Sequence, residues 1–138
     1  MEMVLLPTVL AALVGCAMGG ASLLVPRWGA SVVRLQPDPR WKGGWSEFRA
    51  SYGGAFLLGH AAVLLTYAMR FQAGEAALMG TGFAMGALWM GMAIGRVVSM
   101  VADDREYETR TAYNYVAVGF ESLMGLALWA PFLAHIGR

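Results

Sequence analysis

The sequence has few of the charged residues on which soluble proteins rely. They make up only 14% of the 138 positions, against about 25% in an ordinary soluble domain. Apolar residues make up 58%, and the mean hydropathy is +0.54. A small domain leaves a large share of its surface exposed, so this chain could not hide so much apolar area from water. The composition therefore excludes an ordinary soluble domain and indicates a single domain placed largely in lipid.

Cysteine and histidine are also scarce. Cys16 is the only cysteine, which excludes an internal disulfide and a cysteine-rich metal site. The sequence has no phosphate-binding glycine loop with its lysine, no His-Glu-x-x-His and no Cys-x-x-Cys. The net charge of +1 gives no global field that would attract nucleic acid. We therefore expect no cofactor, no metal and no nucleic-acid partner, and the sequence argues against an enzyme more than for one.

Four apolar segments are long enough to cross a membrane, since a span needs roughly 20 residues. They cover about residues 3–25, 50–69, 76–95 and 112–136. None alternates apolar and polar residues as the strands of a membrane barrel do. We therefore predict an all-α protein, an integral membrane four-helix bundle in which residues 1–138 form one transmembrane domain.

The connections between the predicted spans differ in length. Residues 70–75 contain Gly74 and predict a tight turn, so the second and third spans should form an antiparallel hairpin. Residues 28–35 could form a short helix at the membrane interface. Residues 97–111 are expected to extend the third span before a polar turn.

Basic residues are unevenly divided between the two ends of the predicted bundle. The end that holds both termini carries Arg70 and Arg138. The opposite end carries the other eight: Arg27, Arg34, Arg40, Lys42, Arg49, Arg96, Arg105 and Arg110. Loops rich in Lys and Arg stay in the cytoplasm. We therefore predict a multi-pass protein of the bacterial inner membrane with both termini in the periplasm.

Ionisable residues near or within the predicted spans are candidate functional residues, because a charge in lipid is costly. Glu121 lies about nine residues into the fourth span, roughly 12–14 Å from its cytoplasmic end at 1.5 Å per residue. His60 reaches a similar depth in the second span. The remaining candidates lie at the same end of the bundle: Glu47, Arg49, Tyr52 and Arg96.

We expect these residues to form a buried polar cluster in which Arg49 or Arg96 pairs with Glu121, directly or through Tyr52 or Tyr115. Three roles stay open for the cluster. It could fix helix register, form a polar pocket for a small ligand or lipid headgroup, or act as a catalytic or proton-carrying site. For His60, a hydrogen bond between helices is favoured over a metal, haem or chlorophyll ligand, because no second histidine lies at ligand spacing.

Three pairs of glycines lie four residues apart within the predicted spans. Small residues at this spacing let helix backbones approach closely. The pairs therefore predict a tight bundle without naming a partner: Gly15 and Gly19, Gly82 and Gly86, Gly91 and Gly95.

Three short blocks carry a resemblance to a known family. Residues 47–54 read Glu-Phe-Arg-Ala-Ser-Tyr-Gly-Gly and lead into an apolar segment. The second and third blocks consist of Gly95, Arg96, Ser99 and Asp103, and of Phe120, Glu121 and Gly125. Together they resemble a bacterial family of small four-helix membrane proteins known as domain of unknown function 4345. The resemblance covers nearly the whole chain and implies a four-helix fold and a membrane location, but no activity.

The leading functional hypothesis is a non-enzymatic structural or accessory subunit that packs against a larger membrane complex, respiratory or photosynthetic, or against itself. The alternative is a lipid- or isoprenoid-binding membrane protein whose pocket has its polar end at Arg49, Arg96 and Glu121. A third hypothesis is an enzyme that acts on such a lipid with Glu121 as acid or base. An accessory subunit should show a flat apolar face without a cavity. A lipid binder should show an elongated cavity of roughly several hundred Å³ with few polar groups at one end.

Overall fold

The computed structural model describes residues 2–136, and all regular secondary structure in that range is helical. This confirms the all-α prediction. The long helices are α1 (Glu2–Leu24), α6 (Glu75–Ala102) and α8 (Ala112–Leu133). A continuous run over residues 44–68 consists of α3 (Gly44–Phe48), the π-helical segment η1 (Arg49–Ala55) and α4 (Phe56–Ala68). The short helices are α2 (Pro26–Val33), α5 (Arg70–Ala73) and α7 (Asp104–Tyr107).

Three helices within the described residues are long and apolar enough to cross a membrane: Met3–Leu24, Glu75–Ala102 and Ala112–Leu133. They match the first, third and fourth predicted spans. The second predicted span, 50–69, overlaps the run 44–68, which is 25 residues long but contains η1. The crossing by this run therefore stays a prediction.

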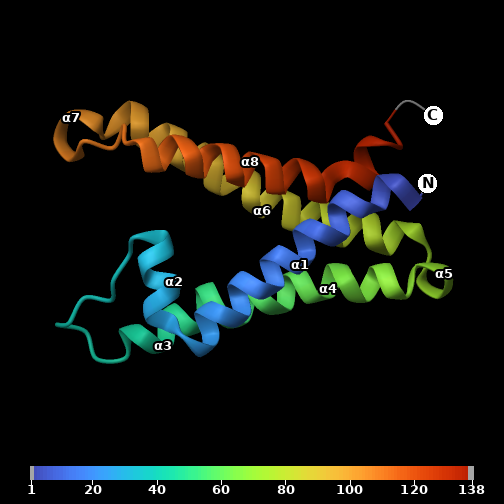
Figure 1. The fold of residues 1–138 in the computed structure, drawn as a ribbon, viewed down its shortest axis with the longest axis horizontal. Coiled ribbons are helices and arrows are strands. Elements are labelled where there is room, and N and C mark those ends of the chain that lie inside the picture. The colour runs from blue at the N-terminus through green and yellow to red at the C-terminus, as the bar shows by residue number, and fades with distance from the viewer. Residues whose placement is uncertain (1, 137–138) are drawn as a thin grey trace.

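The helices form two packed pairs. α1 packs along α4 and η1, and α6 packs along α8. α1 also contacts α8, and α4 contacts α6, so the pairs meet over part of their length. Figure 1 shows that α1 begins and α8 ends at the same end of the molecule as α5. The pairs diverge toward the opposite end, where α2, α3 and α7 lie (Figure 1).

Apolar side chains and short polar links hold the pairs together where they meet. The Thr8 hydroxyl donates to the Ala127 carbonyl at 2.8 Å, joining α1 to α8. The Thr66 and Thr81 hydroxyls lie 2.8 Å apart and join α4 to α6. The buried apolar core around them consists of Leu5, Ala11, Ala12, Val63, Leu78, Trp89, Met124 and Leu128.

Two of the three glycine pairs lie at close helix contacts. A Cβ on Gly19 would lie 2.5 Å from the Leu57 backbone nitrogen, and one on Gly82 would lie 2.8 Å from the Leu128 carbonyl oxygen. In contrast, no described atom lies within 4 Å of a Cβ built on Gly91 or Gly95. The packing prediction is therefore wrong for this third pair, because these glycines lie where the α6 surface is open.

The connections follow the sequence expectations. α5 and Gly74, whose φ is 82°, make the turn of the hairpin between α4 and α6. α2 covers most of the short helix predicted at 28–35, and it begins with a proline at the first helical position, where proline is favoured. α6 continues past residue 95, as expected, and ends before the polar turn that contains α7.

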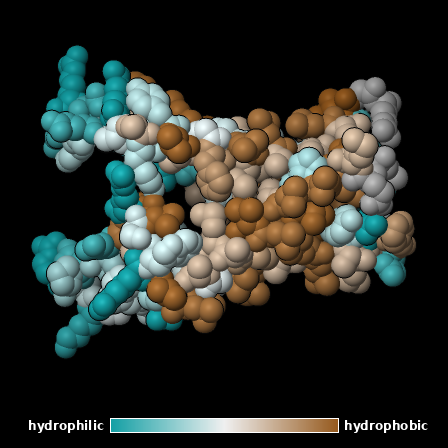
Figure 2. Space-filling model, viewed as in Figure 1, coloured by the Kyte–Doolittle hydropathy of each residue, from teal (hydrophilic) through white to brown (hydrophobic). Residues whose placement is uncertain are grey.

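The surface is divided in the way expected of a membrane protein. Figure 2 shows apolar residues over the middle of the molecule and hydrophilic residues concentrated at the end formed by α2, α3 and α7. The surface is hollowed at that end, between the two helix pairs (Figure 2).

Candidate functional site

A cleft of about 740 Å³ lies between the two helix pairs. Residues of α1, α2, η1, α4, α6 and α8 line it. Most of its wall is apolar and aromatic, including Met18, Phe56, Trp89, Met92, Val116 and Phe120. Its charged lining residues are Arg34, Arg96 and Glu121. The cleft therefore combines a long apolar wall with a few polar groups.

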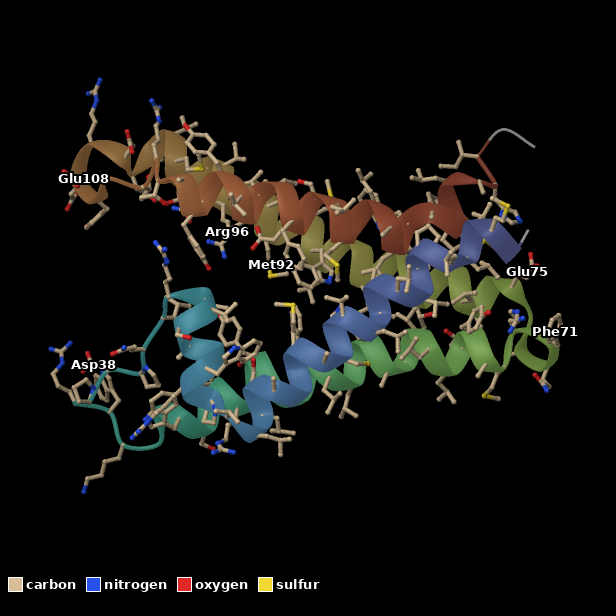
Figure 3. The ribbon with its side chains drawn as sticks, viewed as in Figure 1. Asp38, Phe71, Glu75, Met92, Arg96 and Glu108 are labelled. Carbon is tan, nitrogen blue, oxygen red and sulfur yellow. The ribbon has the colours of Figure 1, made fainter. Side chains whose placement is uncertain are left out.

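Arg96 and Glu121 form an ion pair in the cleft. Arg96 Nε donates to Glu121 Oε1 at 2.7 Å, joining α6 to α8. The Glu121 side chain is 6% exposed, whereas that of Arg96 is 27% exposed. Figure 3 shows Arg96 and Met92 directed into the space between the helix pairs. Both residues line the cleft, and the carboxylate is the more deeply buried of the two.

Asn114 fixes the position of the guanidinium. Its Oδ1 accepts from Arg96 Nη1 at 3.2 Å, and its Nδ2 donates to the Thr109 carbonyl at 2.7 Å. Its backbone N–H donates to the hydroxyl of Thr111, which caps the start of α8. These bonds leave the amide one orientation, so Arg96 is held between two residues of α8.

One oxygen of the buried carboxylate lacks a partner among the described residues. Glu121 Oε2 makes no hydrogen bond with any described residue. Buried polar atoms in native proteins are nearly always hydrogen-bonded, and an orphaned one calls for an explanation. The ion pair is therefore incomplete as an internal network.

His60 lies behind the cleft, fully buried, with both ring nitrogens in use. Trp89 Nε1 donates to His60 Nε2 at 2.9 Å, and His60 Nδ1 lies 2.7 Å from the Phe56 carbonyl. The indole N–H can only donate, so Nε2 accepts and Nδ1 carries the proton that it donates to Phe56. This bonding describes a neutral imidazole that joins α4 to α6 and has no free nitrogen for a metal. Gly15 of α1 packs against the ring.

Two predicted members of the polar cluster, Arg49 and Glu47, lie outside the cleft lining, whereas Tyr52 lies within it. Arg49 Nη1 donates to the Leu23 carbonyl at 2.6 Å, near the end of α1, where carbonyls lack partners within the helix. The structure therefore does not pair Arg49 with Glu121, because the end of α1 lies closer to it. Glu47 is exposed on α3, and Tyr52 is half-buried, stacks on Phe48 and lines the cleft.

The mouth of the cleft holds a contact that the sequence reasoning missed. The Tyr113 hydroxyl donates to the Val32 carbonyl, joining α8 to α2. The Arg34 guanidinium lies 3.8 Å from the centroid of the Tyr113 ring, a cation–π arrangement. The partners are about 80 residues apart in the sequence, and no sequence pattern indicates that they are in contact. We refer to Val32, Arg34 and Tyr113 as the mouth contact.

Trp89 and Asn114 were also missed, although spacing gave a signal for both. Trp89 lies seven residues before Arg96, and Asn114 lies seven before Glu121. Seven residues are two helical turns, so each pair shares a helix face. Residues on one helix face meet the same neighbouring helices, so Asn114 bonds Arg96 from α8 as Glu121 does, whereas Trp89 bonds His60 of α4.

Comparisons of this chain with protein-family models, with curated proteins and with solved structures gave no match.

Proposed function

We propose that this protein is a multi-pass membrane protein that binds a lipid-like amphiphile in the cleft between its helix pairs. The observation that carries the proposal is the cleft itself, whose volume of about 740 Å³ lies in the range of small-molecule sites. An acyl or isoprenoid chain would lie against Phe56, Trp89 and Phe120. Its head would reach Arg96 and Glu121.

The accessory-subunit hypothesis has less support. It predicts a closed bundle with a flat apolar face, whereas the two helix pairs diverge around a cleft. Its remaining support is the apolar outer surface (Figure 2), which any membrane-spanning bundle presents. Packing against a larger complex or a second copy would use that outer surface and is compatible with a filled cleft.

We further propose that all four helical segments cross the bacterial inner membrane, with the termini on the periplasmic side. Eight of the ten basic residues belong to the end opposite the termini in the predicted topology, and basic loops stay in the cytoplasm. Of the two at the terminal end, Arg138 lies outside the described residues. With this orientation the cleft opens toward the cytoplasm.

We also propose membership of the family known as domain of unknown function 4345, on the three sequence blocks that resemble it. That membership supplies no activity, so the functional proposal rests on the cleft alone.

The experiment that tests amphiphile binding uses a matched pair of glycines on α6. Gly95 lines the cleft, and Gly91 lies one turn away outside its lining. Neither has a described atom within 4 Å of a Cβ added to it, so a side chain can start from both positions without a clash at its Cβ. The wild type, Gly95→Trp and Gly91→Trp are purified gently from membranes and weighed by native mass spectrometry.

We expect the wild type and Gly91→Trp to carry a bound amphiphile, and Gly95→Trp to lose it because the indole fills the cleft. A wild-type protein without any bound mass would refute the proposal. Equal retention of the amphiphile by both variants would refute it as well. Co-purification of the wild type with a larger complex, with an empty cleft, would restore the accessory-subunit hypothesis.

A further inference from the structure

We infer that the head of the bound amphiphile is a neutral alcohol, whose hydroxyl lies between Arg96 and Glu121. The inference rests on the proposed function, since it names the chemistry of the ligand in the same cleft. It begins from the one buried side-chain oxygen among the described residues that lacks a hydrogen bond, Glu121 Oε2.

Glu121 Oε2 requires a donor from outside the described chain. Glu121 is 4% exposed and lines the cleft. A carboxylate oxygen only accepts, and leaving it buried without a donor costs free energy. Because Glu121 lines the cleft, the head of a ligand placed beside it can supply this donor. The head of the ligand must therefore carry an O–H or N–H group.

Arg96 requires the opposite property of the same head. Its Nε and Nη1 are bonded to Glu121 and Asn114, but a guanidinium has five N–H donors. The side chain is 27% exposed where it lines the cleft. Its remaining donors therefore need an acceptor. A hydroxyl group accepts through its oxygen and donates through its proton, so it serves both residues at once.

Charged heads fit this position poorly. Arg96 and Glu121 cancel each other, so the pair offers no net charge to an anion or a cation. A carboxylate or phosphate only accepts and would lie against the Glu121 carboxylate, whereas an ammonium would lie against Arg96. The other charged residue in the lining, Arg34, is stacked on Tyr113 at the mouth.

The wall beside the pair suits an apolar chain attached to such a head. Trp89 and Met92 line the cleft within two helical turns of Arg96 on α6, and Phe120 lines it beside Glu121 on α8. The Trp89 N–H is already bonded to His60, so the indole offers the ligand only apolar surface. Apart from Arg34, the charged groups of the lining are Arg96 and Glu121.

The test compares three photoreactive probes that carry the same diazirine-bearing chain and differ only in the head. One ends in a hydroxyl, one in its methyl ether and one in a carboxylic acid. Each competes for crosslinking to the purified protein in detergent. We expect the alcohol to bind about tenfold more tightly than the ether, because only the alcohol donates to a charged acceptor.

The variant Glu121→Gln supplies the second measurement. Glutamine keeps an oxygen for Arg96 but replaces Oε2 with an N–H donor, so the preference for alcohol over ether should fall toward one. Glu47→Gln is the matched control, because Glu47 is exposed on α3 and lies outside the cleft lining, and it should keep the preference. If Glu121→Gln does not fold, the comparison of probes on the wild type still decides.

Each outcome separates the two proposals. Crosslinking of alcohol and ether with equal affinity, or best binding by the acid, would overturn the alcohol inference while leaving amphiphile binding in place. A tenfold preference that survives in Glu121→Gln would move the hydroxyl away from this residue and overturn it as well. Failure of all three probes would overturn the proposed function itself.

Discussion

At the scale of single residues, the ion pair of Arg96 and Glu121 is a stabilising contact in which one carboxylate oxygen, Oε2, has no hydrogen bond among the described residues. Asn114 holds the guanidinium, and the guanidinium bonds one carboxylate oxygen. A buried charge is tolerated when it is paired, but removing one partner leaves the other uncompensated. The pair therefore stabilises the contact between α6 and α8 only while both members are present.

The substitution Arg96→Met should be more harmful than removal of both charges. It leaves the Glu121 carboxylate buried without its cation, at a cost of about 3 kcal/mol. The double variant Arg96→Met with Glu121→Met replaces the pair with apolar groups and should recover most of that loss. Reversible unfolding in detergent measures all three free energies. A double variant less stable than Arg96→Met would contradict the idea that pairing is what makes the buried charge acceptable.

The hydrogen bond between Trp89 and His60 gives a second residue-scale prediction. Trp89→Phe keeps much of the ring but removes the donor, leaving His60 Nε2 buried and unsatisfied at about 1–3 kcal/mol. Trp129→Phe is the matched control. Its indole donates to the Phe83 carbonyl nearer the surface, so the same change should cost less. Melting temperatures of the two variants decide, and equal losses would argue against a special role for the buried imidazole.

Sequence reasoning identified Glu121, Arg96 and His60 because polar groups within apolar spans are costly, and this cost is visible in a sequence. It could not choose between Arg49 and Arg96 as the partner of Glu121, because both lie at the same end of the bundle. The choice depends on where α1 ends, since the Leu23 carbonyl accepts from Arg49. Contacts that depend on where a helix ends and how it is rotated cannot be predicted from residue spacing alone.

At the scale of elements, small residues and a π-helical segment set how the helices approach. Gly53 of η1 packs against Leu23 of α1, where an added Cβ would lie 2.8 Å from the Leu23 Cα. π-helical turns widen the helix and often occur at functional sites. Here η1 carries Tyr52 into the cleft lining while Gly53 faces α1. The sequence predicted a helix over this stretch but carried no pattern that indicates a π-turn.

Two glycines of α6 should respond in opposite ways to the same substitution. In Gly82→Ala the added methyl group would meet the Leu128 backbone oxygen at 2.8 Å, so α6 and α8 must separate, at about 1–3 kcal/mol. In Gly91→Ala the methyl group meets no described atom within 4 Å. This variant should be neutral or gain up to about 1 kcal/mol from helix propensity. Thermal unfolding in detergent compares them, and a destabilised Gly91→Ala would place an unseen partner against that face.

The mouth contact predicts how quickly the cleft exchanges its occupant. Tyr113→Phe removes the hydroxyl that bonds the Val32 carbonyl of α2 but keeps the ring beneath Arg34. Release of a bound amphiphile should accelerate severalfold, with little change in melting temperature because the contact lies at the rim. Tyr115→Phe, at an exposed position on the same helix, is the control. Exchange with a fluorescent amphiphile measures the dissociation rate of both variants. Identical rates would show that the bond between Tyr113 and α2 does not slow release of the ligand.

At the scale of the whole molecule, the direction of the helical segments could be predicted but their divergence could not. Each apolar run reaches the length of a span, roughly 20 residues, and the short turn at Gly74 forces the two segments that it joins to be antiparallel. The cleft instead arises because close glycine contacts join the helices within each pair, while bulky side chains such as Trp89 and Phe120 lie between the pairs. Whether a bundle closes depends on all of these contacts together, and sequence spacing does not give them.

The predicted topology can be tested with single cysteines in a Cys16→Ala background. Lys42, Gln72 and Arg105 are exposed and lie in the segments that join the helical runs. If all four segments cross, a membrane-impermeant maleimide should label Gln72→Cys in cells with a permeabilised outer membrane. It should reach Lys42→Cys and Arg105→Cys only after the inner membrane is opened.

The same labelling decides whether the run over residues 44–68 crosses the membrane, despite the π-helical segment within it. If the run did not cross, the positions on either side of it would react together, so Lys42→Cys and Gln72→Cys would share one accessibility. A crossing separates them and places Lys42 with Arg105, at the end where the helix pairs diverge (Figure 1). That end carries the cleft mouth and most of the basic residues, so the labelled side is also the side from which a ligand enters. Labelling of Lys42→Cys and Arg105→Cys from outside would invert the orientation and open the cleft to the periplasm.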